Sequence, residues 1–392
     1  NTTVSFANTE GNTDVVYLIR TKDDTSTART LTWPSGIAWN GGTEPTLVDV
    51  NATDDYHVFK LTTRDNGATW YGLEVFKNKT GGTLWSWGQN GPGMLGHNNV
   101  DVHYSSPVQL PGTTWSKVFT TTQTTAAIKT DGTLWTWGPN TNGELGLNSR
   151  GTSYSSPVQV GSDTTWRTTD NSVACAKIST MAIKTDGTLW AIGAPYATNI
   201  PFPGGYRSSA VQIPGTTWSK ISGGMGSSFL AIKTDGTLWG WGNNAIGTLG
   251  LNTSADAYSP TQIPGTWNYA HVGYAHGLGI KTNGELWVWG DNRFGNLAQN
   301  YINNPGGGTT FSSPIQIPGT NWLKTAHYSY HSTSALKTDG TLWSWGRDLR
   351  GSLGLNQQGN DVQYSSPVQV PGTNWVDIAS AYYGVTALKS GL

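Results

Sequence analysis

Short strands in which apolar and polar residues alternate are predicted along most of the chain, and residues 115–160 show the pattern best. Strands rich in Trp, Val, Ile and Thr are expected at residues 115–119, 125–129, 133–137 and 154–160. Asp131-Gly132 separates the second strand from the third, and Asp-Gly favours a tight hairpin turn. Pro157 has no backbone N–H to donate, so the fourth strand belongs on the outer edge of its sheet. This pattern predicts a four-stranded antiparallel sheet.

The phrase Thr-Leu-Trp-x-Trp-Gly repeats along the chain with a period of about fifty residues. Full copies begin at Thr83, Thr133, Thr237 and Thr341, and looser copies begin at Thr188 and Glu285. A fixed period of this length, with several short strands in each unit, is typical of a β-propeller in which each unit forms one blade. These six units predict an all-β protein whose main part is a six-bladed β-propeller.

The two ends of the repeat region are complementary. The first unit starts with its third strand, whereas the last unit stops before its third strand. We therefore expect one blade to be built from both chain ends, with two inner strands from residues 375–392 and two outer strands from residues 82–110. In that arrangement Val385–Lys389 lies beside Leu84–Trp87. Such a pairing closes the ring and removes its free sheet edges.

Three motifs recur in the units: an opening Trp-x-Lys-Ile, an Ala-Ile-Lys-Thr-Asp-Gly turn, and a Leu-Trp-x-Trp-Gly-x-Asn-x-x-Gly-x-Leu-Gly loop. This pattern resembles the repeat of the regulator of chromosome condensation family, especially its bacterial and phage versions, and it covers residues 79–392. The resemblance implies a β-propeller, although the best-known members of that family have seven blades. The third unit departs from the pattern because it lacks the second Trp and the Gly-x-Leu-Gly loop. It has Pro195, Pro201, Phe202 and Pro203 instead.

Residues 1–78 do not repeat and are expected to form a separate module. Short strands are predicted near residues 3–6, 15–20, 29–33, 57–62 and 69–75, which indicates a small antiparallel β-sandwich. The run from Leu31 to Leu47, followed by Thr69-Trp70-Tyr71-Gly72, resembles a module of tail-fibre and other appendage proteins of tailed bacteriophages. That resemblance implies attachment to other virion proteins and a homo-oligomer, for which a trimer is one option.

Composition excludes several classes of protein. The net charge is -1 and 12% of the residues are charged, with no block of basic residues, so we expect no nucleic-acid partner. No apolar run has the length needed to cross a bilayer, so we expect no membrane insertion. The single cysteine, Cys175, cannot form an internal disulfide and is best interpreted as a small buried residue.

Candidate catalytic and metal-binding residues are expected to belong to the scaffold. The sequence has no nucleophile elbow, phosphate-binding loop or zinc-protease motif. The recurring aspartates precede glycine in each turn, which indicates turn chemistry, and they are Asp131, Asp186, Asp235 and Asp339. His276 and His331 occupy equivalent places in adjacent units; a metal pair is conceivable, but the resemblance implies a structural hydrogen-bonding role. We therefore expect no enzyme activity, no cofactor and no metal.

Binding is expected in the segments that break the repeat, because loops on a rigid scaffold carry function in such folds. These segments are residues 195–206, 300–308 and 357–363, which are rich in aromatic and amide side chains. Aromatic rings stack on the C–H faces of sugars while amides meet the hydroxyl groups. The candidate ligand-binding residues are Tyr196, Phe202, Tyr206, Tyr301, Asn303, Tyr328, Tyr330, Tyr382 and Tyr383.

These observations lead to one expected function and several alternatives. We expect a non-enzymatic component of a tailed-phage virion, a tail-fibre adhesin that recognises a host-surface glycan or protein. A capsid fibre or decoration protein is the first alternative, and a soluble, inhibitor-like protein-binding propeller is the second. A glycan-cleaving enzyme is disfavoured because no paired carboxylates occur outside the turns.

Overall fold

A computed structural model describes the following residues: 2–3, 13–20, 31–32, 37–39, 56–63, 70–77, 82–120, 124–169, 171–176, 179–193, 207–224, 226–301, 310–326, 332–348, 351–357, 362–381 and 384–390. Within them all regular secondary structure is β, as the sequence predicts. The chain divides into two compact units, residues 1–80 and 81–392.

The described residues of the N-terminal unit form a four-stranded and a two-stranded sheet. The four-stranded sheet has the order β2 (Thr13–Arg20), β5 (Tyr56–Thr63), β6 (Trp70–Lys77), β4 (Ile37–Trp39), and β1 (Thr2–Thr3) pairs with β3 (Leu31–Thr32). The long strands pair antiparallel, but the β4–β6 and β1–β3 pairs are parallel. The expectation of a wholly antiparallel module was therefore wrong in these two pairs. Parallel pairing needs a long connection, and the chain between β4 and β6 supplies one that includes β5.

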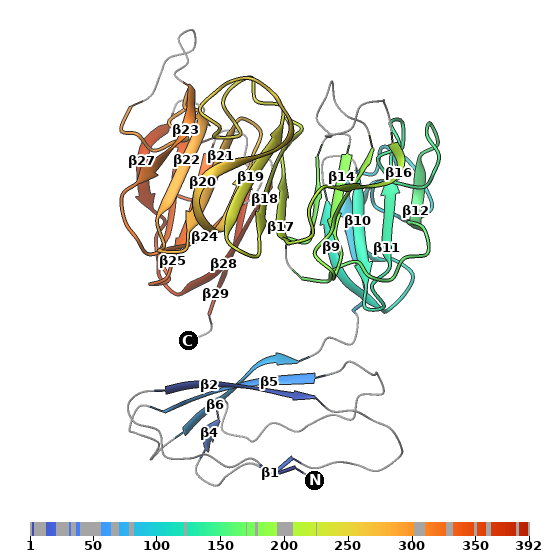
Figure 1. Cartoon of the computed structure of the whole chain (residues 1–392), viewed down its shortest axis with the longest axis horizontal. Coiled ribbons are helices and arrows are strands. Elements are labelled where there is room, and N and C mark those ends of the chain that lie inside the picture. Colours follow the sequence, from blue (N-terminus) through green and yellow to red (C-terminus); the bar gives the residue numbers. More distant parts are fainter. Residues whose placement is uncertain are drawn as a thin grey trace. The chain divides into compact units, whose positions relative to one another are not determined.

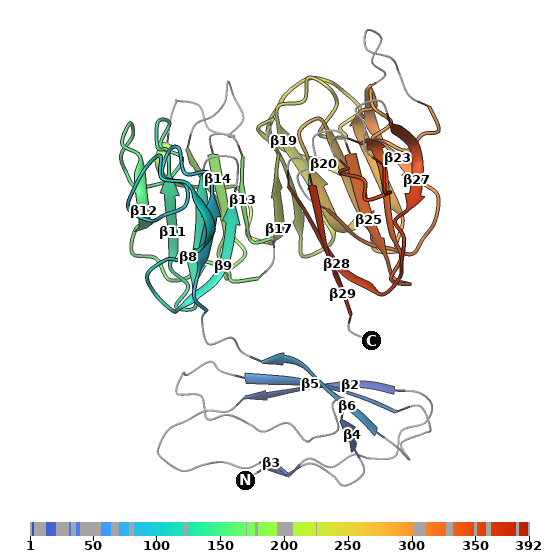
Figure 2. The ribbon, with the colours of Figure 1, turned by 180° about the vertical axis from the view of Figure 1, so that it is seen from behind.

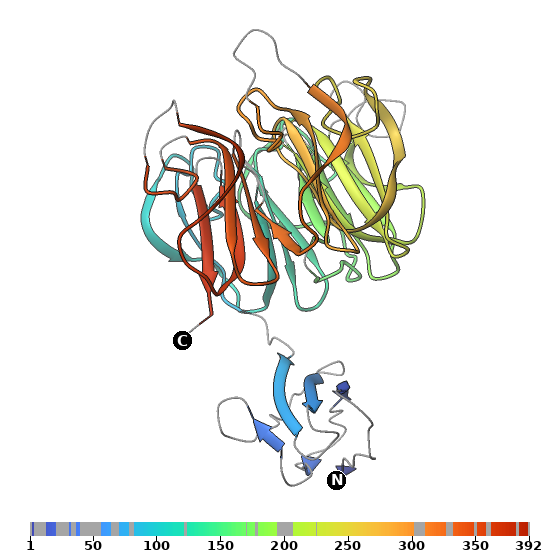
Figure 3. The same ribbon diagram turned by 90° about the vertical axis from the view of Figure 1, so that its left-hand side faces the viewer.

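The second unit consists of sheets that pack face to face, as two directions of view show (Figure 1, Figure 3). Blade two is β9 (Trp115–Thr120), β10 (Thr125–Lys129), β11 (Leu134–Gly138) and β12 (Tyr154–Gln159), and blade three is β13 (Val173–Cys175), β14 (Ser179–Ile183), β15 (Leu189–Gly193) and β16 (Arg207–Ile213). Blades four and five share the long strand β20 (Ala257–Val272), which joins β17 (Trp218–Gly223), β18 (Ser228–Lys233) and β19 (Thr237–Gly242) to β21 (His276–Lys281), β22 (Leu286–Asp291) and β23 (Thr310–Ile317). Blade six is β24 (Trp322–Thr325), β25 (Ser332–Lys337), β26 (Leu342–Arg347) and β27 (Gln363–Gln369).

Strand order and pairing confirm the sequence prediction for blade two. The order is β12-β11-β10-β9 with antiparallel neighbours, so the strand that contains Pro157 forms the outer edge. Along β11, Leu134 and Thr136 point to one face of the sheet, while Trp135 and Trp137 point to the other. Leu134 packs in one hydrophobic cluster with residues of blade three, and Trp137 packs in another with Leu84 and Leu110.

The same packing is repeated from blade to blade and forms the core. The leucine face of blade four packs on Trp267 and Trp289 of blade five, and the leucine face of blade five packs on Trp322 and Trp345 of blade six. The second tryptophan of the motif is fully buried at each of these contacts. Burial of such large apolar side chains between neighbouring sheets is the main source of stability in this repeat.

The predicted ring closure is not formed in this structure. β7 (Trp85–Gly88) pairs with β8 (Tyr104–Gln109), and β28 (Trp375–Ala381) pairs with β29 (Gly384–Lys389), but each pair is a separate two-stranded sheet. Figure 2 shows β8 and the β28–β29 pair in different halves of the unit. Each pair is held instead by its neighbour in sequence: Gly82 exchanges two backbone hydrogen bonds with Trp115, and the Trp375 N–H donates to the Gly340 carbonyl. Pairing of β7 with β29 would join residues that are far apart in the sequence. The contacts that each end sheet makes with its neighbour in sequence do not require this pairing.

Candidate functional site

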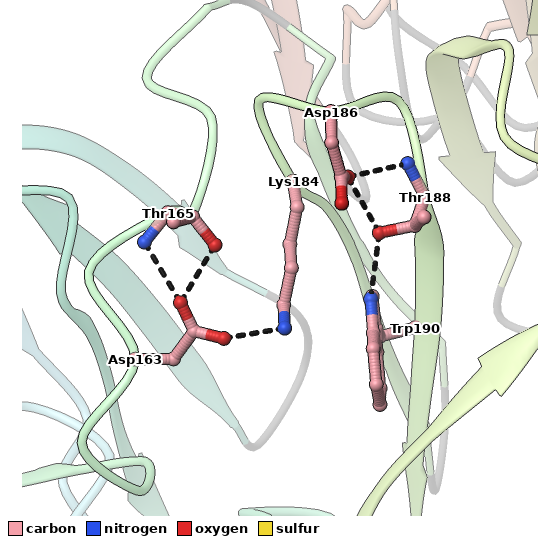
Figure 4. A network of polar contacts seen from close by, with 6 residues as sticks. All are labelled: Asp163, Thr165, Lys184, Asp186, Thr188 and Trp190. Carbon is pink, nitrogen blue, oxygen red and sulfur yellow. Dashed lines mark hydrogen bonds and ion pairs between the residues drawn. The ribbon is translucent and has the colours of Figure 1, made fainter.

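A polar network recurs at the hairpin turns and accounts for the repeated aspartates. In blade three an Oδ1 atom of Asp186 accepts hydrogen bonds from the Thr188 backbone N–H (2.9 Å) and from its hydroxyl (2.7 Å), and the Trp190 indole donates to the same hydroxyl (2.9 Å) (Figure 4). The Lys184 ammonium lies 4.0 Å from the centre of the Trp190 ring. Hydrogen bonds from Thr188 hold the pKa of Asp186 below its usual value. The same bonds recur at Asp131, Asp235 and Asp339. The predicted turn role of these aspartates is confirmed.

Blade three adds one ion pair to this network. Asp163 accepts hydrogen bonds from the Thr165 backbone and hydroxyl and forms a salt bridge with Lys184 (Figure 4). Burial opposes ionisation of Asp163, but the hydrogen bonds from Lys184 and Thr165 outweigh it and lower the pKa of its carboxyl to about 2. Lys184 is thus held by a carboxylate and by two indole faces, those of Trp166 and Trp190. These contacts fix the start of the blade.

Tryptophan side chains also connect neighbouring blades through the Gly-x-Leu-Gly loops. The Trp137 indole and the Thr125 hydroxyl both donate to the Met94 carbonyl, at 2.9 and 3.0 Å. The Trp289 indole donates in the same way to Thr248 (2.7 Å), and the Trp345 indole donates to Asn296 (2.8 Å). The loop carbonyl of one blade therefore anchors the second tryptophan of the next.

Of the two histidines considered above as metal ligands, His276 is described, and it has a structural role. His276 is 3% exposed and lies between the Thr333 hydroxyl, 3.1 Å from Nε2, and the Asn296 amide, 3.4 Å from Nδ1. Burial lowers the pKa of His276 to about 4, so the ring is neutral at pH 7. His331 lies outside the described residues. The part of the chain that the structure describes holds no group of three potential metal-ligand side chains.

Cys175 fits its predicted role as a small buried residue. Its side chain is 7% exposed and packs in a hydrophobic cluster with Trp166 and Ile192. Burial raises the pKa of the Cys175 thiol to about 11, so no thiolate is present at neutral pH. No helix in the described residues is long and apolar enough to span a bilayer.

Tyr301 is the one candidate ligand-binding residue that falls within the described part of the chain. It is 40% exposed, its ring centre lies 6.2 Å from that of Phe311, and its carbonyl accepts a hydrogen bond from the Asn292 amide. An exposed aromatic ring on an anchored backbone is a suitable stacking surface. The other candidates lie outside the described residues: Tyr196, Phe202, Tyr206, Asn303, Tyr328, Tyr330, Tyr382 and Tyr383.

An apolar groove lies beside strand β7, and sequence analysis did not predict it. We call it the β7 groove; its volume is about 250 Å³ and its main lining residues are Trp85, Trp87, Met94, Val118, Thr125 and Trp137. Sequence reasoning missed it because ring closure was expected to cover these side chains. The signal that could have revealed it is the split of one repeat unit between the two chain ends.

Comparisons with known proteins agree with this architecture. The model of the regulator of chromosome condensation (RCC1) repeat matches residues 131–183, 235–279 and 339–388, and a second model of that repeat matches residues 272–296. A comparison with curated proteins gives no match.

Three solved structures resemble the chain in fold. Yeast RCC1 (Prp20) bound to Kap60 gives a TM-score of 0.65 at 17% identity over 79% of this chain and 78% of the other. Prp20p from Saccharomyces cerevisiae gives 0.66 at 15% identity, with 85% and 81% covered. Human WBSCR16 gives 0.66 at 19% identity, with 85% of each chain covered. The chain therefore carries regulator of chromosome condensation repeats at the matched residues, and its fold is a β-propeller like that of the similar solved structures.

Proposed function

We propose that this protein is a non-enzymatic component of a tailed-phage particle whose propeller binds a host-surface glycan or protein. One observation carries the binding part of the proposal: the repeated polar side chains already serve the scaffold. The turn aspartates are saturated by threonine donors, and the buried His276 bridges two blades. A scaffold whose conspicuous polar groups are occupied in this way is suited to display loops.

The phage assignment is supported by residues 1–78. Their resemblance to the attachment module of tail-fibre and appendage proteins suggests docking on other virion proteins, with the propeller displayed outward. A surface with few charged residues fits an extracellular particle, because its contacts depend little on ionic strength. A tail location agrees best with the proposed receptor binding, and a capsid fibre is the alternative location.

Tyr301 indicates what the loops would bind. Its half-exposed ring lies at the start of a segment rich in Asn and Gly, residues 300–308. An aromatic face combined with amide donors and acceptors matches the C–H faces and hydroxyl groups of a sugar. On this proposal Tyr301→Ala weakens attachment, whereas Tyr258→Ala, at another exposed tyrosine (54%), is a matched control that leaves attachment unchanged.

Electron microscopy of purified particles tests the particle assignment. Gold-labelled antibody against the propeller should bind the tail tip or tail fibres. Label on the head would replace the tail assignment with the capsid alternative. Particles that carry no label and contain no peptide of this chain by mass spectrometry would overturn the proposal.

A soluble protein-binding propeller is the second candidate function. It is favoured by the solved structures, since the similar propeller Prp20 is described with protein partners in both of its structures, Kap60 in one and Gsp1p and histones in the other. Full-length chain that co-purifies with one soluble protein at a fixed ratio, together with unlabelled particles, would favour this candidate over the first.

A further inference from the structure

The loops that follow the tryptophan motif, here called the motif loops, differ in charge from blade to blade. Three of them contain neither Lys nor Arg: residues 88–96, 138–146 and 242–250. The motif loops of blades five and six, residues 290–298 and 346–354, contain Arg293 and Arg347 within the described part of the chain. Phe294 stands where the other three loops have proline, asparagine or isoleucine. Positive charge and an aromatic ring therefore occur together at the junction of two blades.

Guanidinium groups from these two blades lie beside one phenyl ring. Arg293 and Phe294 belong to the motif loop of blade five, and Arg347 is the last residue of β26 in blade six. The Arg293 Cζ atom lies 5.9 Å from the centre of the Phe294 ring, and the Arg347 Cζ atom lies 5.0 Å from it. A guanidinium can contact an aromatic ring and still donate hydrogen bonds from its edge. We call these three residues the Arg–Phe cluster.

A buried carboxylate orients Arg293. Asp291 is 1% exposed; its Oδ2 accepts a hydrogen bond from Arg293 Nε (2.7 Å), and its Oδ1 accepts one from the Arg293 backbone N–H (3.0 Å). The Arg293 side chain is 44% exposed, and its two Nη atoms have no hydrogen-bond partner among the described residues. Asp291 thus holds the guanidinium in place while its terminal nitrogens stay available to a ligand.

The charge balance shows what kind of recognition the Arg–Phe cluster allows. Asp291 pairs with Arg293, and the fully buried Asp348 follows Arg347 in the chain, with its Oδ1 bound to the Leu353 N–H. Two carboxylates therefore balance two guanidiniums, so long-range attraction contributes little. Recognition depends instead on directed N–H donors, and the fork of a guanidinium matches a carboxylate better than it matches a hydroxyl group.

The arginines are not needed to dock a motif loop on the next blade. At four junctions an asparagine backbone N–H donates to a serine carbonyl in the outer strand of the next blade: Asn98 to Ser155, Asn148 to Ser208, Asn252 to Ser312 and Asn300 to Ser365. Three of these four junctions follow a motif loop without Lys or Arg. The Arg–Phe cluster is therefore an addition to the common packing of the repeat.

The Arg–Phe cluster lies at the same end of the blades as Tyr301. β22 runs from the hairpin turn of blade five to its motif loop, and β26 runs in the same way in blade six. The Asn292 Nδ2 atom donates to the Tyr301 carbonyl (3.3 Å), which fixes the Tyr301 backbone beside the residue that precedes Arg293. The exposed tyrosine and the two arginines therefore belong to one face of the propeller.

We propose that the Arg–Phe cluster binds the carboxylate of an acidic sugar, so that the glycan recognised by this face is an acidic one. The N–H groups of Arg293 and Arg347 donate to the carboxylate oxygens, and Tyr301 supplies a stacking surface for a sugar ring of the same chain. This specifies the substrate class of the proposed glycan binding and rests on that proposed function. Uronic acids and sialic acids share the required chemistry, a carboxylate on a pyranose ring.

Binding to matched acidic and neutral polymers tests the substrate class. The full chain is passed over immobilised polygalacturonate, hyaluronan and polysialic acid, and over the same polymers after their carboxyl groups have been reduced to alcohols. At least one acidic polymer should bind about tenfold more tightly than its reduced form, because charge-assisted hydrogen bonds are lost on reduction.

Two results contradict an acidic ligand. Equal binding of an acidic polymer and its reduced form would overturn the acidic-sugar proposal but leave the proposed function intact, since a glycan would still be bound. No binding to any of these polymers would also overturn it, and inhibition of phage adsorption by the same chain would then show separately whether the proposed function survives.

Substitution of the arginines tests the site itself. Arg347→Ala should weaken binding to the acidic polymer about tenfold and leave binding to the reduced polymer unchanged. Arg150→Ala is the control, because Arg150 is exposed and lies between β11 and β12, at the corresponding end of blade two. Equal losses in the two variants would show that binding follows the total charge of the protein, which contradicts a site at Arg347.

A charge-conserving variant keeps the test valid if Arg347→Ala disturbs folding. Arg293→Lys retains a positive charge beside Asp291 but removes the planar fork, so the midpoint of thermal unfolding should stay the same. Binding to the acidic polymer should still weaken about fivefold, because an ammonium group cannot donate in the same paired geometry. A folded Arg293→Lys protein that binds the acidic polymer as tightly as the native chain would contradict the proposal.

Discussion

At the scale of single residues, each position of the repeat has one structural role. Where a blade departs from the repeat, a buried polar atom can be left without a hydrogen-bond partner. The Trp241 indole faces blade three, which lacks the Gly-x-Leu-Gly loop, and Trp241 Nε1 has no hydrogen-bond partner in the described part of the chain. The asparagine that caps the Gly-x-Leu-Gly loop shows the regular case, in which both ends of the amide are paired. Asn244 Oδ1 accepts from the Leu249 N–H, and its Nδ2 donates to the Thr253 carbonyl.

Asp348 replaces this asparagine in blade six and leads to a prediction. Asp348 is fully buried, its Oδ1 accepts from the Leu353 N–H, and its Oδ2 has no hydrogen-bond partner in the described residues. Asp348→Asn removes an unpaired acceptor and supplies the missing donor, so it should raise the free energy of unfolding by about 1–3 kcal/mol. Chemical denaturation measures this. The reverse change, Asn292→Asp in blade five, should destabilise the protein by a similar amount, and a stabilising effect there would contradict the argument.

His276 predicts a dependence of stability on pH. Its folded pKa of about 4 lies below its unfolded value of 6.5, so the unfolded chain binds the proton more readily. The contribution of the neutral ring is therefore fully present above pH 6.5 and is lost as the pH falls to about 4, with a total of about 3 kcal/mol. Denaturant unfolding of the native chain and of His276→Gln should converge in free energy across this range. Parallel pH profiles for the two proteins would show that His276 is not responsible.

At the scale of the elements, the hairpin turns determine how closely one blade approaches the next. Gly132 has a φ of +77°, which favours glycine, and a Cβ added there would lie 2.0 Å from the Thr164 carbonyl oxygen of the following blade. Gly236 has a similar φ of +81°, but the nearest atom to an added Cβ is 3.7 Å away. The difference follows from the connection after blade four, which is shorter, because Trp267 comes directly after Pro264-Gly265-Thr266.

This pair of glycines separates backbone strain from steric conflict. Gly236→Ala should cost about 1 kcal/mol of stability, the strain of a left-handed residue alone. Gly132→Ala should cost about 3 kcal/mol, because the added methyl group also displaces the Thr164 backbone. Thermal or denaturant unfolding of both variants measures the difference. Equal losses would mean that the turn of blade two does not set the spacing between the sheets.

At the scale of the whole molecule, the periodic features were predictable from sequence and the aperiodic ones were not. The turn aspartates and the buried tryptophan faces follow from period and alternation, and the outer position of Pro157 follows from its missing N–H donor. These are local rules that five complete blades repeat.

The separation of the two end sheets could not be predicted, because their pairing would depend on the most distant contact in the sequence. Trp87 and Leu388 are exposed, although their sequence contexts match those of their buried equivalents Trp345 and Leu336. The parallel pairing of β4 with β6 was missed for a related reason, since alternation within a strand does not determine its direction. The candidate loop residues break the repeat, so no periodic rule places their side chains.

The central proposal is that the propeller presents a binding surface for the host on a phage particle, and inhibition of adsorption tests this proposal most directly. The purified chain is added to host cells before the phage proposed to carry it, and the rate of phage adsorption is measured. The account predicts that adsorption slows progressively as the chain concentration rises, and that Tyr301→Ala protein inhibits less than Tyr258→Ala protein. Adsorption that is unchanged at saturating concentrations of the folded chain would contradict the account.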